Sequence, residues 1–348
     1  MIALAELLEE SRGEGVFSGA AYAIGTTERV LEAGAIGTTA WEASAAVTAE
    51  TMWDIASVTK PVVAVEVMLL VESGQIRLDS CLGDLLPGYR GTDKAAITVA
   101  QLLTHSSGIP GQQPLYLTYA TGDELLGSLR SLPLSFAPGR GVEYTSQGFM
   151  ILGQVVERVT GQPLDQLLEV SVLGPLGMAT TMFCPPTRLV PLTAATELCP
   201  WRGRLVKGTV HDENAHVLGG IAGHAGLFST AEDLARLGRA MLGRGQVDGH
   251  QVFSEELIAS MTEPRTDHLS LRRCYGWQGA DRDGCPVGSS VSGRSYGHTG
   301  FTGTSLWLDP PRGLFIVLLT NAVHPRRRPE GLKQLRPRFH DLVIQQFA

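Results

Sequence analysis

The sequence has few cysteines, and those it has follow no recognisable pairing pattern. The five are scattered, with no Cys-x-x-Cys motif and no regular spacing: Cys81, Cys184, Cys199, Cys274 and Cys285. A disulfide framework and a zinc knuckle both depend on ordered cysteine spacing, so neither is expected. We interpret these residues as free thiols in a reducing compartment.

The sequence also lacks an apolar run long enough to cross a membrane. The longest, residues 61–71, contains Glu66 and falls short of the roughly 20 residues that a membrane-spanning helix needs. Residues 1–10 carry no basic segment ahead of an apolar one, so we expect a short amphipathic helix there rather than a signal peptide. The chain is therefore predicted to be cytoplasmic and not to bind membranes.

The sequence also has no excess of positively charged residues. The 348 residues include 28 Lys and Arg against 35 Asp and Glu, which gives a formal net charge of −7. Nucleic acids and anionic lipid surfaces are bound through basic patches, so neither is an expected partner. The short basic stretch Arg326, Arg327 and Arg328 lies among prolines and is interpreted as a solvated loop. The length suffices for one large domain or for two intertwined subdomains.

Motifs that bind cofactors or metals are absent from the sequence. No Gly-rich phosphate loop follows a predicted strand and no His-Glu-x-x-His helix occurs, so neither a cofactor nor a metal is expected. His211, Asp212, His216 and His224 are metal-ligand types close together, but the glycines around them favour a loop. Whether that loop lines a cleft or only maintains its own structure stays open.

Strand-like patterns lie at both ends of the sequence, and helical patterns lie between them. Compact apolar runs predict two hairpins, with strands at 18–24, 29–36, 304–308 and 314–320. Helices are predicted at 57–72, 151–160, 165–173, 231–242 and 329–347. A capping box from Ser229 to Glu232 is expected to open the helix at 231–242.

This order of elements predicts an α+β fold with an antiparallel sheet. Residues 1–81 and 270–348 are expected to form one α/β subdomain from both ends of the chain. Residues 82–269 are expected to form an inserted, mostly helical subdomain. The active site is predicted in the cleft between them, where small-molecule sites are common.

Ser57 and Lys60 are the first candidates for chemistry. They stand three residues apart where the buried helix at 57–72 is expected to begin, so their side chains share one helical face. A serine hydroxyl needs a partner that takes its proton, and a desolvated lysine can serve or assist. The amide groups at a helix N-terminus also favour developing negative charge. The same spacing would also occur if Ser57 were only a helix cap and Lys60 only a surface lysine.

The wider sequence resembles the class C β-lactamase-like serine hydrolases, a superfamily of penicillin-binding-protein-like enzymes. It also contains D-alanyl peptidases, D-aminopeptidases and carboxylesterases. Ser57 and Lys60 match its Ser-x-x-Lys motif. Four further segments resemble the family in the expected order: residues 101–110, Pro138-Gly139 leading into residues 144–146, residues 173–178, and His298-Thr299-Gly300. The similarity runs from about residue 19 to residue 321 and implies a β-lactamase/transpeptidase-like fold.

The resemblance assigns roles to the residues of the second motif. Tyr144 would act with Lys60 as general base toward Ser57 and then return the proton to the leaving group. Ser146 stands where the family usually has asparagine, and a hydroxyl has one donor fewer than an amide. Recognition of a substrate amide through Ser146 is therefore weakened. His105, in the segment 101–110, is interpreted as structural rather than catalytic.

The third motif is expected to border the substrate. His298 replaces the family's usual lysine, and a histidine with its ordinary pKa is mostly neutral at neutral pH, so a substrate carboxylate would be held less firmly there. Thr299 and Gly300 complete the motif, and glycine suits a close approach of ligand to backbone. The oxyanion hole implied by the resemblance consists of the backbone N–H groups of Ser57 and Phe301.

The sequence therefore predicts a serine hydrolase that forms an acyl-enzyme on an ester, an amide or a D-amino-acid peptide bond. His298 and Ser146 favour carboxylesterase-like or peptidase-like activity over efficient β-lactam hydrolysis. A penicillin-recognising sensor with little turnover is the alternative. The expected partner is a small-molecule or peptide substrate, and the oligomeric state stays open.

Overall fold

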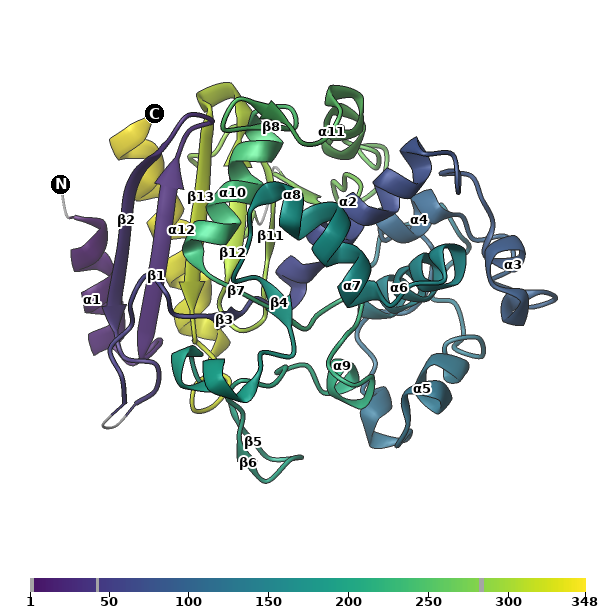
Figure 1. Cartoon of the computed structure of the whole chain (residues 1–348), viewed down its shortest axis with the longest axis horizontal. Helices are drawn as coiled ribbons and strands as arrows, with labels where there is room; N and C mark the ends of the chain where they lie inside the picture. Colours follow the sequence, from purple (N-terminus) through teal and green to yellow (C-terminus); the bar gives the residue numbers. More distant parts are fainter. Residues whose placement is uncertain (1–2, 42–43, 282–284) are drawn as a thin grey trace.

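A six-stranded antiparallel sheet joins the two ends of the chain in the computed structural model, which describes residues 3–41, 44–281 and 285–348. The strand order is β10-β11-β12-β13-β1-β2. The bounds are β1 Gly19–Gly25, β2 Val30–Gly37, β10 Gln278–Gly279, β11 Tyr296–Thr299, β12 Ser305–Asp309 and β13 Leu314–Thr320. Because β1 pairs with β13, the first and last strands of the chain lie side by side near the middle of the sheet (Figure 1).

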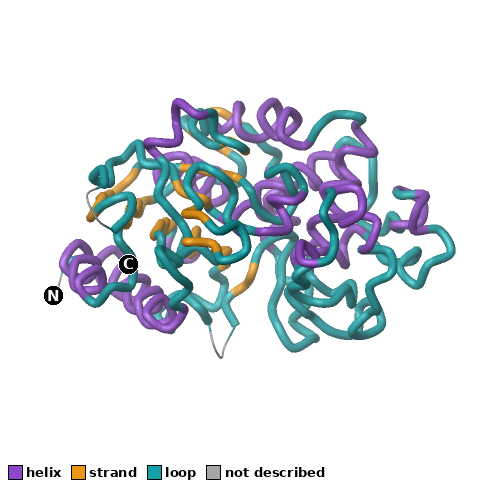
Figure 2. Tube along the Cα trace, turned by 90° about the horizontal axis from the view of Figure 1, so that it is seen from below, coloured by secondary structure: helices purple, strands orange, loops and turns teal. Residues whose placement is uncertain are grey.

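Both faces of this sheet are covered, as the alternation of side chains on β1 and β13 requires. Tyr22 and Ile316 point to the face covered by α1 (Leu4–Gly13) and α12 (Pro329–Phe347). Ala23 and Val317 point to the opposite face, where α10 (Ala231–Leu242) packs. Figure 2 shows the resulting layers, with the two terminal helices on one side of the strands and the other helices beyond them.

The remainder of the chain is mainly helical and surrounds α2 (Thr59–Glu72), which is buried along nearly its whole length. The other helices are α3 Leu82–Leu85, α4 Val99–Leu103, α5 Gly122–Ser128, α6 Ser146–Thr160, α7 Leu164–Leu168, α8 Gly174–Leu176, α9 Glu213–Val217 and α11 Glu255–Thr262. Short strands complete it: β3 Trp53–Asp54, β4 Met182–Phe183, β5 Leu198–Cys199, β6 Arg204–Leu205, β7 Leu227–Ser229, β8 Gln246–Val247 and β9 His250–Gln251. One apolar core runs from α10 and the sheet into these helices.

The predicted elements agree with the structure in type and differ at several ends. The four strands and the two hairpins are confirmed to within one residue, and α12 has the predicted bounds. The helix expected at 151–160 begins earlier, at Ser146, because Thr145 caps it. The helix expected at 165–173 is α7, which continues as a π-helix over Glu169–Leu173. The N-terminal helix is α1, and residues 1 and 2 of the prediction lie outside the described residues.

The predicted capping box of α10 was wrong by one position. Thr230, not Ser229, is the N-cap, and its hydroxyl accepts from the backbone N–H of Asp233 at 3.2 Å. Ser229 ends β7 instead, and its hydroxyl hydrogen-bonds with Thr181 at 2.8 Å. Ser229 therefore belongs to the strand, and Thr230 caps the helix that follows it.

Two sequence-based statements need a separate comment. All five cysteines are free thiols, as expected. Among the helices of the described residues, none combines the length and the apolar character needed to span a bilayer. The division into residues 1–81 with 270–348 and residues 82–269 stays a prediction.

Candidate active site

Ser57 lies in a tight turn between β3 and α2. A single 3₁₀ turn, η1 (Ala56–Val58), precedes α2, so the nucleophile stands just before the helix that carries Lys60. Ala56 has φ of 47°, a left-handed conformation that costs a non-glycine residue roughly 1–3 kcal/mol. Such a conformation persists only where neighbouring groups fix it. The turn is therefore expected to be held from several sides.

Asp54 makes the main contacts that hold this turn, and no local sequence feature marks it as a functional residue. Its carboxylate accepts from the backbone N–H of Ala56 at 2.8 Å and from that of His211 at 2.6 Å. The hydroxyls of Thr302 and Thr304 donate to the carbonyls of Asp54 and Ile55, at 2.7 and 3.0 Å. Burial raises the pKa of Asp54, against the two N–H donors, which favour the carboxylate. The loop after β11 and the segment at His211 thus both fix the position of Ser57.

The structure brings Ser57, Lys60 and Tyr144 together. The Lys60 ammonium donates to Ser57 Oγ at 3.0 Å, and the Tyr144 hydroxyl donates to the same oxygen at 2.7 Å. Lys60 Nζ also lies 4.9 Å from the centroid of the Tyr144 ring. Lys60 is completely buried, so its charge acts in a poorly screened environment. One hydroxyl is therefore contacted by both an amine and a phenol.

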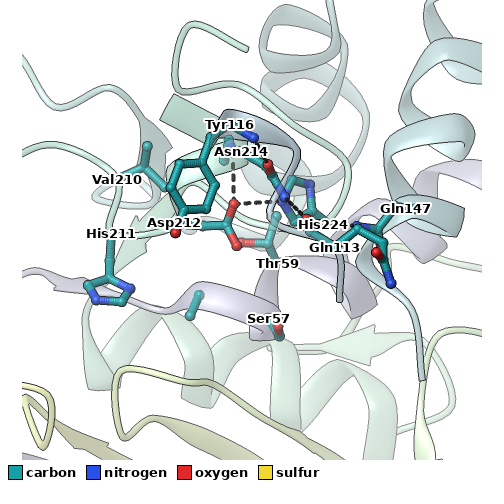
Figure 3. A network of polar contacts seen from close by, with 12 residues as sticks. Ser57, Thr59, Gln113, Tyr116, Gln147, Val210, His211, Asp212, Asn214 and His224 are labelled. Atoms are coloured by element: carbon teal, nitrogen blue, oxygen red, sulfur yellow. Dashed lines mark hydrogen bonds and ion pairs between the residues drawn. The ribbon is translucent and has the colours of Figure 1, made fainter. Parts of the chain in front are cut away.

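A hydrogen-bonded pair behind this centre, the buried His224 and the partly exposed Asp212, fixes the lysine. Besides its hydrogen bond to Ser57, the Lys60 ammonium donates a hydrogen bond to the backbone carbonyl of His224 at 3.0 Å. The ring of His224 contacts Asp212, with 3.0 Å between Nε2 and Oδ1 (Figure 3). Asp212 also caps α9, because its Oδ1 accepts from the backbone N–H of Ala215 at 2.8 Å. Burial opposes ionisation of Asp212, but the His224 contact and the Ala215 N–H lower its pKa overall.

These contacts resolve the open question about residues 211–224. His211 contacts Glu197, with 2.9 Å between Nε2 and Oε2, and its ring stacks on Phe301 at 5.6 Å. His216 packs edge-on against Trp201. The segment lies beside the reactive centre and supports it through backbone and ring contacts. In the sequence, the segment stands out only because several His and Asp residues lie close together. That pattern does not distinguish residues that hold the active site in position from residues that bind a metal.

The third motif lies on β11 against the turn of Ser57. His298 is buried, and its Nδ1 donates to the carbonyl of Thr299 at 2.9 Å. Burial, followed by the charge of Lys60, lowers the pKa of His298 to about 3. The direction of this pKa change agrees with the predicted neutral histidine, which stays a prediction. A Cβ on Gly300 would lie 2.5 Å from the carbonyl oxygen of Ile55, so only glycine fits this approach.

A cavity of about 470 Å³ opens over Ser57. Of the predicted site residues, it is lined by Ser57, Tyr144, His298, Thr299, Gly300 and Phe301. Ser146, the first residue of α6, is buried and does not belong to this lining. His105 packs against the ring of Tyr144 at 4.8 Å and accepts from the backbone N–H of Thr145 at 3.2 Å. The structural interpretation of His105 agrees with these contacts.

The cavity also contains basic residues that the sequence analysis did not select. Five cations line it, and no carboxylate does among its described lining residues: Arg273, Arg327, Arg328, Lys333 and Arg336. The stretch 326–328 is exposed, as expected of a solvated loop, but Arg327 also pairs with Glu197 at 2.9 Å and Glu213 at 2.6 Å. Arg336 is buried, donates weakly to the carbonyls of Gly300 and Thr304, and has its pKa lowered to about 10 by burial.

Comparison with known proteins identifies the family of this chain. A profile of the beta-lactamase family matches residues 4–337. A protein of Escherichia coli (strain K12), provisionally named a D-alanyl-D-alanine carboxypeptidase, is 32% identical over 314 residues, which cover 79% of this chain and 71% of the relative. The chain therefore belongs to the beta-lactamase family and is a serine hydrolase of the acyl-enzyme type.

Solved structures share the fold at lower identity. The octameric penicillin-binding protein homologue from Pyrococcus abyssi superposes with a TM-score of 0.77 at 23% identity, over 98% of this chain and 77% of that one. EstCE1, described as a hydrolase with promiscuous acyltransferase activity, has a TM-score of 0.77 at 21% identity, over 96% and 97% of the two chains. The predicted α+β, β-lactamase/transpeptidase-like fold is confirmed.

Proposed function

We propose that this protein cleaves an ester or a D-amino-acid peptide bond, with Ser57 as nucleophile and Tyr144 and Lys60 as the groups that handle its proton. One observation carries this assignment. Ser57 Oγ lies 2.7 Å from the Tyr144 oxygen and 3.0 Å from Lys60 Nζ, in a cavity open to a small molecule. A candidate base must be within hydrogen-bond reach of the proton it takes, and both groups meet that condition.

The proton follows a short route in this proposal. In the reactive form of this proposal Tyr144 has released its own phenolic proton to solvent, and the nearby ammonium of Lys60 stabilises the resulting phenolate. As Ser57 Oγ attacks the substrate carbonyl, its proton passes to that phenolate oxygen. Tyr144 then donates the proton to the departing oxygen or nitrogen. Water repeats the sequence on the acyl-serine. The hydrogen-bonded pair of Asp212 and His224 holds Lys60 in place through the His224 carbonyl.

Negative charge on the substrate oxygen is assigned to the backbone N–H groups of Ser57 and Phe301. The close approach of Gly300 to Ile55 supports this pair, because it places the residue after Gly300 beside the Ser57 turn. Two such N–H groups stabilise a tetrahedral intermediate more strongly than they stabilise the planar carbonyl.

The substrate class follows from the third motif and from the relatives. His298, with its lowered pKa, stands where the family usually has a charged lysine, and Ser146 lies away from the cavity lining. The relatives and neighbours include a provisionally named carboxypeptidase and a hydrolase with acyltransferase activity. We therefore place peptidase-like and carboxylesterase-like reactions ahead of β-lactam hydrolysis. Substrate contacts at Thr299 and Gly300, and a cytoplasmic location, remain predictions.

Intact-mass spectrometry after treatment with a fluorophosphonate tests the nucleophile. We expect one adduct on the wild-type protein and none on Ser57→Ala, whereas an adduct on both would reject Ser57. Comparison of kcat/KM on p-nitrophenyl esters, D-alanyl peptides and nitrocefin tests the substrate order. A dominant nitrocefin rate would reverse our order, and stable labelling without turnover would indicate a sensor.

A further inference from the structure

Large apolar side chains are exposed on the hairpin of β5 and β6, which projects from the rest of the fold in Figure 1. Leu198 and Leu205 lie directly opposite each other in the two strands and are 58% and 39% exposed. Trp201, in the turn between them, is 42% exposed, and Leu117, which lines a cleft of about 480 Å³ with it, is 65% exposed. We call these four residues the apolar cluster. Contiguous exposed apolar groups of this kind are typical of interaction sites.

The indole of Trp201 is held in position on this hairpin. Its ring packs edge-on against Tyr116, with 5.0 Å between centroids, and against His216, at 6.0 Å. The next residue, Arg202, fixes the turn, because its guanidinium donates to the backbone carbonyls of residues 210–212 at 2.8, 3.1 and 3.3 Å. A side chain that is already ordered loses little conformational entropy when it binds, so Trp201 is suited to anchor a contact.

Positive charge lies around the apolar cluster. Arg204 is in β6, and Lys207 follows that strand. Arg326 adjoins the hairpin, because the N–H of Leu198 donates to the carbonyl of Pro325 at 2.8 Å. Arg204 and Arg326 are exposed, and neither they nor Lys207 form an ion pair with the residues that the structure describes. We call these three residues the basic group.

The charge of the basic group is not cancelled by its neighbours. Glu197 and Glu213 lie beside the hairpin, and both are paired with Arg327. The pKa of His216 is lowered by burial and then by the charges of the two arginines of the hairpin. In a chain whose net charge is −7, this surface is therefore locally positive.

An apolar tip flanked by cations matches an anionic lipid surface. Tryptophan favours the boundary between headgroups and acyl chains, leucine enters the upper acyl region, and arginine and lysine bind lipid phosphates. A projecting tip can enter that boundary, whereas a protein partner would need a matching hollow. Two copies of this chain in a two-fold contact would bring the same cations together, and these repel each other. Shape and charge therefore favour lipid over protein.

Docking through the hairpin would also orient the catalytic cavity. Arg327 lines that cavity and pairs with Glu197, the residue before β5. Its Cζ lies 5.2 Å from the ring centroid of Phe301, another lining residue, which is 47% exposed. The cavity mouth and the hairpin are thus neighbours. A lipid surface in contact with the hairpin would lie close to the opening over Ser57.

We propose that the β5–β6 hairpin docks the protein on an anionic phospholipid surface, with the apolar cluster at the level of the headgroups and the basic group on lipid phosphates. The contact is peripheral and reversible, because only a few side chains reach the lipid. It concerns where the protein works and does not depend on the proposed function. We expected no membrane partner from the net charge of the whole chain, but that sum does not reveal how the charges are distributed.

Co-sedimentation with vesicles tests the basic group. Vesicles of phosphatidylcholine and phosphatidylglycerol, in a ratio of about two to one, should bind the wild-type protein about 10-fold more tightly than vesicles of phosphatidylcholine alone, and added salt should weaken the binding. Arg204→Gln should lower the partition coefficient roughly 5-fold, and its combination with Arg326→Gln about 20-fold. Arg294→Gln is the matched control, because Arg294 is exposed and lines a separate cavity beside α11. Its partition coefficient should stay within about 2-fold of the wild type.

Fluorescence tests the apolar cluster. Of the other tryptophans, three are buried and one is half-buried, so vesicles with brominated acyl chains should quench mainly the emission of Trp201, and Trp201→Phe should remove that quenching. Leu198→Gln should lower the partition coefficient roughly 5-fold, since an apolar side chain in contact with lipid becomes polar. Val170→Gln is the control, because Val170 is more exposed than Leu198 but lies in the π-helix after α7. It should bind as the wild type does.

No sedimentation of the wild-type protein with the mixed vesicles overturns this proposal. Binding that Arg204→Gln and Leu198→Gln leave unchanged also overturns it, because the lipid would then contact another surface. Self-association that Leu198→Gln abolishes, without vesicle binding, would assign the hairpin to a second copy of the chain. Binding of poly-L-glutamate, with no quenching by brominated lipid, would assign it to an acidic protein.

Two measurements keep these results separate from folding and from catalysis. Thermal midpoints equal to that of the wild type show that the variants are folded. Fluorophosphonate labelling of Ser57 should be the same in all of them, because none of the changed residues lines the catalytic cavity. Absence of labelling in the wild type would reject the proposed function and leave the vesicle result standing.

Discussion

The two sides of the cavity are built differently. On the nucleophile side, Ser57 and Lys60 come from one helical turn, and their oxygen and nitrogen lie 3.0 Å apart. On the substrate side, Arg273, His298 and Arg336 come from three separate segments that meet only through the sheet and α12. The first side is paired internally and complete. The second side carries two buried guanidinium groups, those of Arg273 and Arg336, which form no ion pair with the residues that the structure describes.

This difference predicts two kinds of variant. Changes on the nucleophile side should lower turnover of all substrates alike, whereas changes on the substrate side should alter the ratio between substrates. The turn that carries Ser57 joins the two sides, because residues after β11 hold it. Changes there should affect both activity and stability.

The largest effect is expected at the proton-handling groups. Tyr144→Phe removes the hydroxyl that lies 2.7 Å from Ser57 Oγ and should lower kcat/KM about 10²–10⁴-fold on every ester tested, since general base catalysis is lost. Steady-state kinetics on anionic and neutral esters measure it. Tyr119→Phe removes a phenol outside this cavity and serves as the control. A loss confined to one substrate class would contradict the division between the two sides.

Gly300→Ala should give the next largest effect. The added Cβ would collide with Thr304 Oγ1 and lie 2.5 Å from the carbonyl of Ile55, so it would push the loop away from the Ser57 turn. If Phe301 N–H is an oxyanion donor, its displacement costs roughly 100-fold in kcat. Gly13→Ala, where nothing lies within 4 Å of the new Cβ, is the matched control. Full activity of Gly300→Ala would exclude the proposed oxyanion hole.

Asp54→Asn should reduce both stability and activity. The asparagine side chain has one oxygen, which can accept from the backbone N–H of either Ala56 or His211. Its NH₂ group then faces the other N–H, and that buried donor loses its hydrogen bond. We expect a decrease of about 1–3 kcal/mol in the free energy of unfolding. Urea unfolding measures it, and Asp123→Asn on the exposed surface is the control. A stable but inactive variant would show that Asp54 matters only for the position of Ser57.

A smaller, pH-dependent effect is expected from buried histidines on the substrate side. Burial lowers the pKa of His298 and of His340 to about 3. The unfolded chain binds protons near pH 6.5 and the folded chain does not, so stability is complete above that pH and decreases as pH falls toward 3. Each histidine should contribute on the order of 1 kcal/mol per pH unit in that window.

Urea midpoints at pH 7, 6 and 5 measure this slope. His340→Phe should make it shallower, and His250→Gln at an exposed position should leave it unchanged. A slope unaffected by His340→Phe would mean that the ring titrates alike in the folded and unfolded chains.

What the sequence predicted well depends on local rules. The strands, α12 and the facing of Ser57 and Lys60 follow from side-chain periodicity, which acts over a few residues. Tyr144 needed the family resemblance, because 87 positions separate it from Ser57. The pairs that depend on tertiary packing were not selected: Asp54 with His211, Asp212 with His224, and Arg273 beside Tyr144.

Periodicity carries no information about these contacts. The neighbouring sequence does not reveal whether an aspartate hydrogen-bonds to a buried turn or lies on a solvated loop. Arg273 follows another arginine, Arg272, which forms an ion pair with Asp267, so nothing nearby in the sequence distinguishes the two. Only burial, which the fold determines, separates them.

The braces of the Ser57 turn also have a consequence for biosynthesis. The carbonyls of Asp54 and Ile55 accept hydrogen bonds from residues 248 and 249 positions further along the chain. On the ribosome, the nucleophile therefore emerges long before the threonines that fix it. Contacts of such large sequence separation form late in folding. A nascent chain would therefore remain unreactive until Thr302 and Thr304 have been translated.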